Sequence, residues 1–419
     1  MGSRQVEQKV LVIGAGIVGL LIAQGLKKEG IACTVYESEP SAKHYRPREW
    51  GMSIQWGLPL LETCFDEDKY NKLSTTAVDP NFEPPEPGKV PTFNGETGEW
   101  IIDIPLVRTY RVSRRKFRAF CAEDINVQYD KKLKDIVYSD TDTTVTAQFE
   151  DGSSATGTLL VGAEGTHSLT RHLIFDNDES KAAAHSVLFN AINLHVCYND
   201  AEKARHVRRH HPIMYHAIHP RGYWLFVAIQ DVPDPDKPET WVFQLQCTWK
   251  KTLEPDLSED EVSSLEKHKK RAETFGEPFK SANLWIPEGT KLSVNKLGYW
   301  VPEKWNTRNG RVIIAGDAAH PMTFQRGQGL NHGIADAASL TKLLAAVKDG
   351  SKSQEAAIEE YVDEMVPRAG EEVKMSIVNT EMLHDFEKMT NSPFFKKGGH
   401  ANAGNKQALE EQRAKEEAA

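Results

Sequence analysis

Three glycines near the N-terminus have the spacing with which a backbone turn can hold a diphosphate. Gly14, Gly16 and Gly19 follow a short apolar run of strand length, and they open a segment with helical spacing over residues 17–28. The first glycine permits the tight turn, the second lets the backbone approach a pyrophosphate, and the third lets helix and strand pack closely. Free N–H groups at the helix start would face the phosphates. The alternative is a glycine-rich turn without a ligand.

A carboxylate further along the chain fits the same site. Residues 31–36 predict a second strand, and Glu37 stands at its end, where a carboxylate can accept hydrogen bonds from a ribose. The alternative for Glu37 is a solvated strand end. The strand–helix–strand order favours a parallel sheet with a right-handed crossover. The pattern predicts a cofactor that contains adenosine diphosphate, which FAD and NAD share.

A second group of such residues lies far along the chain. The buried run of residues 312–315 ends in Gly316-Asp317, at the edge of a sheet where ligands bind in α/β folds. Gly327-Gln328-Gly329 then opens a helix that we expect over residues 328–347, and its free N–H groups could hold negative charge. For Asp317 alone, the alternative is a helix cap or a turn residue.

Together these segments resemble the class A, single-component FAD-dependent monooxygenases of the aromatic-hydroxylase type, from Val10 to about Met382. The resemblance implies that FAD is bound and assigns residues to it. The residues implied for the adenosine diphosphate are Gly14, Gly16, Gly19 and Glu37. Those implied for the rest of FAD are Asp317, which would hold ribityl or ribose hydroxyls, Gly327, Gly329 and Leu330.

Three further residues are implied by the same resemblance. Glu164, in Gly162-Ala-Glu164-Gly165, lies in the family's third motif, which is associated with both FAD and NAD(P)H. Arg114 matches the arginine that approaches the FAD pyrophosphate, a role that suits a planar group able to donate two hydrogen bonds. Its alternative is a solvated basic helix end. Arg48 belongs to a segment, residues 46–56, that is similar to fungal members of the family.

The chain departs from the family pattern at two places. Glu164 stands where the family has Asp, which keeps the charge and lengthens the reach by one methylene. Thr323-Phe324-Gln325 stands where the family has a proline shortly before Arg326-Gly327, next to the reactive face of the flavin. The second departure points to a different backbone shape and a different substrate.

The resemblance also implies a reaction. Reduced by NAD(P)H, the flavin would react with O2 to a C4a-hydroperoxide and hydroxylate or epoxidise a small organic substrate of the natural-product type, as in fungal secondary metabolism. Because the chain has one strand–GxGxxG–helix unit, NAD(P)H would bind transiently. The alternatives are an oxidase, a Baeyer–Villiger oxygenase or a halogenase, and a non-redox FAD protein that acts as a binding or cyclisation partner. Trp285-Ile286-Pro287 echoes a halogenase motif only in part.

Three expected antiparallel strands, over residues 212–218, 223–229 and 240–249, would cover the flavin. Alternation places His216 on the face opposite Tyr215, and either face could meet the substrate. His216 is the candidate general base for a phenol. The alternative is a histidine whose hydrogen bonds are satisfied within the sheet, and core packing is the alternative for the neighbouring aromatic residues.

The composition limits the other function classes. The 419 residues are 39% hydrophobic and 26% charged, with a net charge of −9, which argues against a general nucleic-acid binder. The five cysteines form no CxxC pair, so we expect neither disulfides nor a metal site. Without a signal-peptide core or a run of about 20 apolar residues, a cytoplasmic protein without membrane association is expected. The sequence predicts no oligomeric state.

These elements predict an α/β fold: a Rossmann-like FAD-binding domain of the GR2 type, an interleaved β-sheet substrate domain and C-terminal helices. The FAD-binding domain would take residues 1–75, 105–175 and 300–350. The substrate domain would take residues 76–104 and 176–299, followed by helices over 351–396 and a polar tail over 397–419.

Other local patterns add detail to this division. We expect a hairpin over residues 90–104, a helix over 111–123, a strand meander over 132–161, a charged helix over 258–274 and a helix over 354–382, with an irregular surface excursion over 75–98.

Overall fold

The first lobe of the protein is built on a parallel sheet whose strands come from distant parts of the chain. The computed structural model describes residues 8–44, 49–140 and 143–391. In spatial order the strands are β19 (Val312–Ile314), β11 (Leu159–Gly162), β1 (Lys9–Ile13), β2 (Ala32–Tyr36) and β7 (Val127–Gln128), all parallel. Most of their residues are buried, as near-continuous apolar strands require. The glycine turn and Gly316-Asp317 therefore follow two strands of one sheet.

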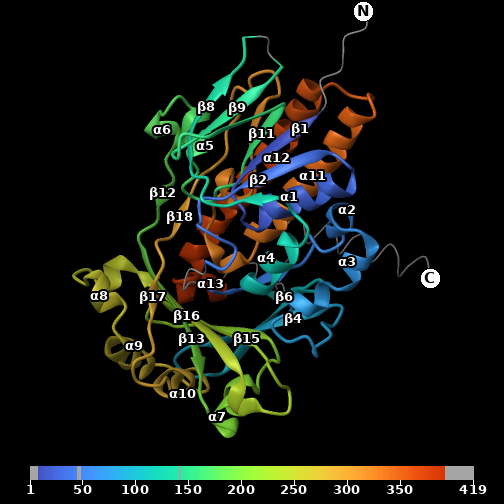
Figure 1. Ribbon diagram of the computed structural model, residues 1–419. Helices are drawn as coiled ribbons and strands as arrows, with labels where there is room; N and C mark the ends of the chain where they lie inside the picture. Colours follow the sequence, from blue (N-terminus) through green and yellow to red (C-terminus); the bar gives the residue numbers. More distant parts are fainter. Residues whose placement is uncertain (1–7, 45–48, 141–142, 392–419) are drawn as a thin grey trace, which may run out of the picture.

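Helices and a smaller sheet complete this lobe (Figure 1). α1 (Ile17–Lys28) has the bounds predicted for it and packs against α11 (Gly329–Lys348), which in turn contacts α12 (Gln354–Leu383). The smaller antiparallel sheet has the order β10 (Ser154–Gly157), β9 (Val145–Phe149) and β8 (Leu133–Tyr138). The meander predicted over residues 132–161 is correct up to β10. Its last strand, β11, instead joins the parallel sheet.

The second lobe contains a seven-stranded sheet (Figure 1). Its order is β17 (Ser293–Val294), β13 (Phe189–Cys197), β16 (Val242–Lys250), β15 (Tyr223–Asp231), β14 (Met214–Ile218), β4 (Gly88–Asn94) and β5 (Trp100–Leu106). The three predicted antiparallel strands and the predicted hairpin are confirmed as β14–β15–β16 and β4–β5. One face of this sheet packs on a cluster that includes Phe275, Phe279 and Ile286, so only the other face is free to meet a substrate.

Short helices and strands join and cover the two lobes. They are α2 (Leu61–Cys64), α3 (Glu67–Asn71), α4 (Arg114–Ala122), α5 (Leu169–Ile174), α6 (Glu179–Ala182), α7 (Ala201–Arg208), α8 (Glu259–Val262), α9 (Leu265–Ala272), α10 (Phe279–Leu284), α13 (Phe386–Asn391), the pair β3 (Gly51–Ile54) with β6 (Tyr110–Ser113), and the pair β12 (His185–Ser186) with β18 (Gly298–Tyr299).

Three local predictions were wrong. Residues 111–113 are not helical, because β6 pairs with β3, and Ser113 then caps α4 by accepting from the backbone N–H of Lys116. The charged helix expected over residues 258–274 is two helices, because Ser264 caps a second one. The excursion over residues 75–98 is not all surface, because Thr76 and Val78 are buried.

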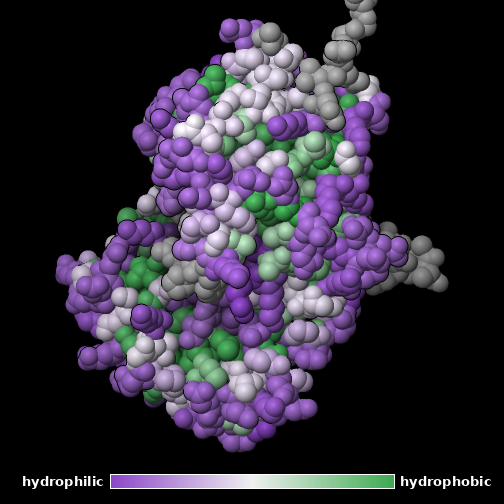
Figure 2. Space-filling model, in the orientation of Figure 1, coloured by the Kyte–Doolittle hydropathy of each residue, from purple (hydrophilic) through white to green (hydrophobic). Residues whose placement is uncertain are grey.

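The outer surface is mainly hydrophilic on the face shown in Figure 2, with hydrophobic side chains in separate patches. Among the described residues, no helix combines the length and apolar character needed to cross a membrane. The predicted tail over residues 397–419 lies outside the described residues.

Candidate functional site

The glycine turn has the close packing that its spacing predicted. Gly14 has φ +105°, and a Cβ there would lie 2.5 Å from the carbonyl oxygen of Ala163. A Cβ on Gly19 would lie 2.2 Å from the carbonyl oxygen of Gly14. Gly16 differs, since its added Cβ would meet only the Ala163 oxygen, at 3.8 Å. The space beside Gly16 is therefore open toward the cavity, where a pyrophosphate could approach the N-terminus of α1.

Glu37 lies at the end of β2 and is bound to the glycine turn. Its Oε2 accepts a 2.7 Å hydrogen bond from the backbone N–H of Ala15, and its Oε1 accepts one of 2.9 Å from the N–H of Glu39. The side chain of Arg118, on α4, lies 4.0 Å from Oε2. Glu37 thus fixes the shape of the turn as well as lining the cavity.

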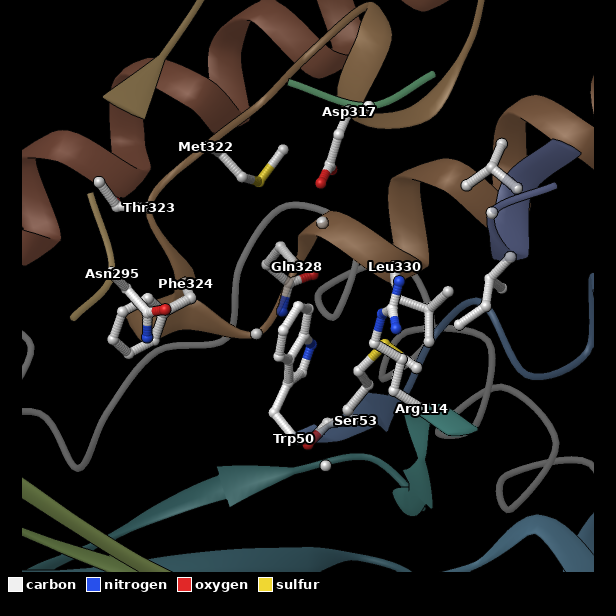
Figure 3. Close-up of a pocket in the computed structure, with 18 of the residues that line it drawn as sticks. Trp50, Ser53, Arg114, Asn295, Asp317, Met322, Thr323, Phe324, Gln328 and Leu330 are labelled. Atoms are coloured by element: carbon white, nitrogen blue, oxygen red, sulfur yellow. The ribbon is translucent and has the colours of Figure 1, made fainter. Parts of the chain in front are cut away.

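Asp317 enters the same cavity from the opposite end of the sequence. It lies three residues after the end of β19, and the N–H of Gly316 before it donates to Asp336 Oδ2 at 2.8 Å. Figure 3 shows the Asp317 carboxylate pointing into the cavity from one side, with Trp50, Ser53 and Arg114 on the other. Partial desolvation inside the cavity raises the pKa of Asp317, and the charge of Arg114 acts in the opposite direction. A carboxylate in such surroundings can accept hydrogen bonds from hydroxyl groups.

Gly327 to Leu330 continue the wall that Asp317 begins. Gly327 has φ +65°, and an added Cβ on Gly329 would lie 3.7 Å from Asp317 Oδ1. Two side chains that follow β3 hold Gln328 in place. Trp56 Nε1 donates to its Oε1 at 2.7 Å, and its Nε2 donates to Gln55 at 3.0 Å. The N-terminus of α11 is therefore fixed beside the cavity, with Leu330 lining it.

Arg114 stands at the first position of α4 and lines the cavity with Asp317 and Gly16. Its guanidinium lies over the ring of Trp50, 4.9 Å from the centroid. This position agrees with the predicted approach to a pyrophosphate, which stays a prediction. Arg48 lies outside the described residues.

One cavity of about 810 Å³ connects these groups. The glycine turn and Glu37 line one end of it, and the sheet of the second lobe lines the other end through Met214, His216 and Phe226. The residues fit a long dinucleotide such as FAD: an open helix N-terminus, a cationic guanidinium and a carboxylate line one continuous space.

Comparisons with known proteins agree with this geometry. Residues 125–376 match the model of the FAD binding domain, and residues 12–73 match that of an NAD(P)-binding Rossmann-like domain. The chain is 43% identical to the FAD-dependent monooxygenase phnB of Penicillium herquei over 93% of this chain and 94% of that one. It is 39% identical to the FAD-dependent monooxygenase cctM of Talaromyces islandicus over 93% and 96%.

The chain belongs to the FAD-dependent monooxygenases.

Solved structures show the same fold at lower identity. A putative FAD-containing monooxygenase from Photorhabdus luminescens matches with a TM-score of 0.72 and 21% identity, over 90% of this chain and 98% of that one. HpxO of Klebsiella pneumoniae, solved with FAD and uric acid, matches with a TM-score of 0.72 and 20% identity, over 94% and 93%. The predicted fold class, family and FAD cofactor are confirmed.

In this monooxygenase the carboxylate of Glu164 accepts hydrogen bonds from residues that follow it closely in the sequence. Its Oε1 accepts from the backbone N–H and the hydroxyl of Thr170, at 2.9 and 2.7 Å, and its Oε2 accepts from Ser168 Oγ at 2.8 Å. These groups belong to the N-terminus of α5, so the carboxylate caps that helix while it lines the cavity. Burial raises the pKa of Glu164. The methylene that Glu164 has in addition to the family's Asp therefore extends the carboxylate toward Ser168 and Thr170.

His216 lies on the sheet face that meets the cavity, but both of its ring nitrogens are engaged. Trp224 Nε1 donates to Nδ1 at 2.7 Å, and Nε2 lies 2.7 Å from Thr92 Oγ1. Because Nδ1 accepts, the neutral ring carries its hydrogen on Nε2 and donates it to Thr92. Burial lowers the pKa of His216 to about 4. This arrangement favours the satisfied sheet histidine over the general base.

The structure also shows which sheet face lines the cavity. Met214, Trp224 and Phe226 line the cavity, whereas Tyr215 and Leu225 pack in the core on the other side. Alternation in the sequence separates the two faces, but both are apolar. Only the folded structure shows that helices cover one face and leave the other to line the cavity.

Several cavity residues were not given a role from the sequence. Trp50, Gln55 and Arg118 hold or line the cofactor end, and Arg111 and Asn193 line the substrate end. The segment around Trp50 was noted only as similar to fungal members. Arg111 and Asn193 lie on strands of different sheets, and only the folded chain links them, through hydrogen bonds that both make with Gln244.

Proposed function

We propose that this monooxygenase uses NAD(P)H and O2 to insert one oxygen atom into a small organic molecule of the natural-product type, by hydroxylation or epoxidation. The observation that carries the proposal is the single cavity, which joins the cofactor-binding residues to a wall of aromatic side chains. FAD, when bound and reduced, supplies the activation of O2 and the transfer of oxygen. The relatives phnB and cctM, each named an FAD-dependent monooxygenase, support the reaction class.

The residues of the chain bind and align the reactants. The open N-terminus of α1 at Gly16, the guanidinium of Arg114 and the carboxylate of Asp317 would hold the cofactor along its length. Gln328, fixed by Trp56 and Gln55, would keep the start of α11 beside the ring system. The domain division predicted from the sequence is part of this proposal.

Apolar side chains would exclude water from the reaction. Trp224 and Phe226 stack at 5.6 Å between centroids with an interplanar angle of 13°, and Phe324 lies 6.0 Å from Trp224. Leu383 and Met389 pack on the same cluster from α12 and α13. A dry site would limit unproductive release of the activated oxygen as H2O2, and it strengthens electrostatic contacts. Phe324 occupies the stretch where the family's proline is absent, so it contributes to the specific shape of this site.

NAD(P)H consumption with and without candidate substrates tests the proposal. Fungal polyketide, terpenoid and indole-alkaloid scaffolds should include one that stimulates oxidation and gives a product heavier by one oxygen atom in mass spectrometry. Asp317→Ala protein without flavin is the control. Substrate-driven H2O2 without NAD(P)H would instead identify an oxidase. Bound flavin that no nicotinamide reduces, even with substrates present, would identify a non-redox FAD protein.

A further inference from the structure

Arg111 is a buried cation at the substrate end of the cavity. It belongs to β6, its residue is 6% exposed, and it lines the cavity with Asn193 and Phe226. The guanidinium lies over the ring of Phe226, 5.1 Å from the centroid. On its other side an added Cβ on Gly51 would lie 2.6 Å from Nε, so the glycine leaves room for the guanidinium. The group is held in a slot between a backbone and an aromatic ring.

The charge of this guanidinium is not neutralised by any described residue. Its hydrogen bond runs from Nη2 to the neutral amide oxygen of Gln244, at 2.7 Å. Nε is buried and has no partner among residues 8–44, 49–140 and 143–391. Within those ranges Arg111 forms no ion pair with a carboxylate. An unpaired buried charge is strongly unfavourable, and a counter-charge would offset this cost.

The nearby acid, Glu49, has other partners. Its Oε1 accepts hydrogen bonds from Ser113 Oγ at 2.9 Å, from the N–H of Arg115 at 3.0 Å and from Gln230 Nε2 at 3.1 Å. These donors bind Glu49 to the N-terminus of α4 and to Gln230 on β15 rather than to Arg111. The carboxylate that would complete the arginine is therefore not supplied by this neighbour.

Gln244 fixes the orientation of the guanidinium. The same Oε1 that accepts from Arg111 also accepts from the N–H of Gly51 at 2.9 Å, and Nε2 donates to Asn193 Oδ1 at 2.7 Å. Asn193 Nδ2 in turn donates to the carbonyl oxygen of Glu49 at 3.2 Å. Gln244 is 1% exposed. These contacts fix the Arg111 guanidinium at the edge of an aromatic cavity, with N–H donors that remain unused.

We propose that Arg111 binds an anionic oxygen on the substrate, a carboxylate or a phenolate carried by an aromatic ring. The inference rests on the proposed function and names the substrate class of the same site. The inference gives the two arginines different roles. Arg114 contacts Trp50 at the cofactor end, whereas Arg111 contacts Phe226 and Gln244 of the substrate sheet. The stacked ring of Phe226 gives an aromatic substrate a surface beside the charge.

Direct binding to the FAD-loaded protein, without NAD(P)H, tests the inference. The probes are 2-naphthoate as the carboxylate, 4-nitrophenolate as the phenolate, and 2-naphthamide as the neutral match of the first. Isothermal titration calorimetry gives the dissociation constants. Wild-type protein should bind an anion more tightly than the amide. Arg111→Met should weaken anion binding roughly tenfold or more, and binding of the amide by less than about threefold.

Two further variants keep the test informative. Arg111→Lys retains the charge and should recover part of the anion affinity. Gly51→Ala retains the arginine but displaces its guanidinium, and it should also weaken anion binding. This variant tests the inference if Arg111→Met does not fold. Arg108→Met removes an exposed arginine that pairs with Glu83 and should change neither probe. The probe that loses more affinity identifies the carboxylate or the phenolate as the preferred group.

Equal binding of anion and amide by the wild-type protein, or equal losses for both in Arg111→Met, would overturn the inference. A lowered flavin reduction potential with unchanged anion binding would also overturn it, since Arg111 would then act on the reduced flavin. Anion preference in a protein that shows no NAD(P)H-driven oxygen transfer would sustain the Arg111 site and refute the proposed function, so the two failures are distinguishable.

Discussion

Gly316 and Val18 lie directly against each other, although they belong to opposite ends of the FAD-binding lobe's sequence. A Cβ added at Gly316 would lie 2.8 Å from Val18 Cγ2, and one added at Gly333 would lie 2.5 Å from the same atom. Only glycines allow α1 to approach both β19 and α11 this closely. The glycine turn and the Asp317 segment are thereby joined into one wall of the cavity.

The three glycines of the turn should respond differently to alanine. Gly16→Ala has room for its methyl group and should leave the free energy of unfolding within about 1 kcal/mol of wild type, while it blocks the approach of the pyrophosphate and weakens FAD. Gly19→Ala would place its methyl group against the Gly14 carbonyl and should destabilise the fold by roughly 1–3 kcal/mol. Urea unfolding and FAD titration separate the effects. Equal destabilisation by both variants would contradict this assignment.

Glu37→Ala should weaken FAD by roughly 1–3 kcal/mol, on the scale of a charged hydrogen bond. The substitution removes the ribose acceptor and also frees the N–H of Ala15, which now donates to Glu37. Fluorescence titration of FAD-free protein measures the loss. Glu29→Ala, at the far end of α1, is the control and should have no effect. Unchanged FAD affinity in Glu37→Ala would refute the ribose role.

Glu164→Ala should lower stability more than it lowers cofactor affinity. The change leaves the N–H and hydroxyl of Thr170 and the hydroxyl of Ser168 without their acceptor, at an expected cost of about 1–2 kcal/mol. Glu164→Asp tests the reach: the shorter side chain should recover only part of the loss. Stability equal to wild type in Glu164→Ala, with FAD lost, would show that the carboxylate serves the cofactor instead.

His216 should make stability depend on acidity. Burial lowers its pKa to about 4, whereas an unfolded histidine has a pKa of about 6.5. Between these values the unfolded chain binds more protons, so stability is full above pH ~6.5 and falls as the pH drops toward ~4, by up to ~1.4 kcal/mol per pH unit.

His216→Gln should therefore lose less stability than wild type between pH 7 and pH 5, by urea unfolding at each pH. His185→Gln, at an exposed histidine, is the matched control and should lose as much as wild type. Parallel losses in His216→Gln and wild type would show that folding does not lower the pKa of this histidine.

Local sequence patterns predicted the elements whose stability depends on residues close together in the sequence. Residues 17–28 form a helix with the expected bounds because apolar periodicity, two terminal lysines and Gly30 agree. Residues 111–113 were wrongly assigned to a helix, because their pairing with β3 brings together segments far apart in the sequence. Glu164 was recognised from its motif, but its capping of α5 was not. Arg111 was not given a role, since its slot is made by Gly51, Phe226 and Gln244 from separate strands.

The central claim is that two distant stretches of the chain hold one FAD, and the FAD content of purified protein tests it most directly. After reconstitution and denaturation, wild-type protein should release about one FAD per chain, and Asp317→Ala should release little while it keeps the wild-type unfolding transition. Asp349→Ala, at the C-cap of α11, should release as much as wild type. Wild-type protein that cannot be loaded with FAD, or full FAD content in Asp317→Ala, would contradict the account.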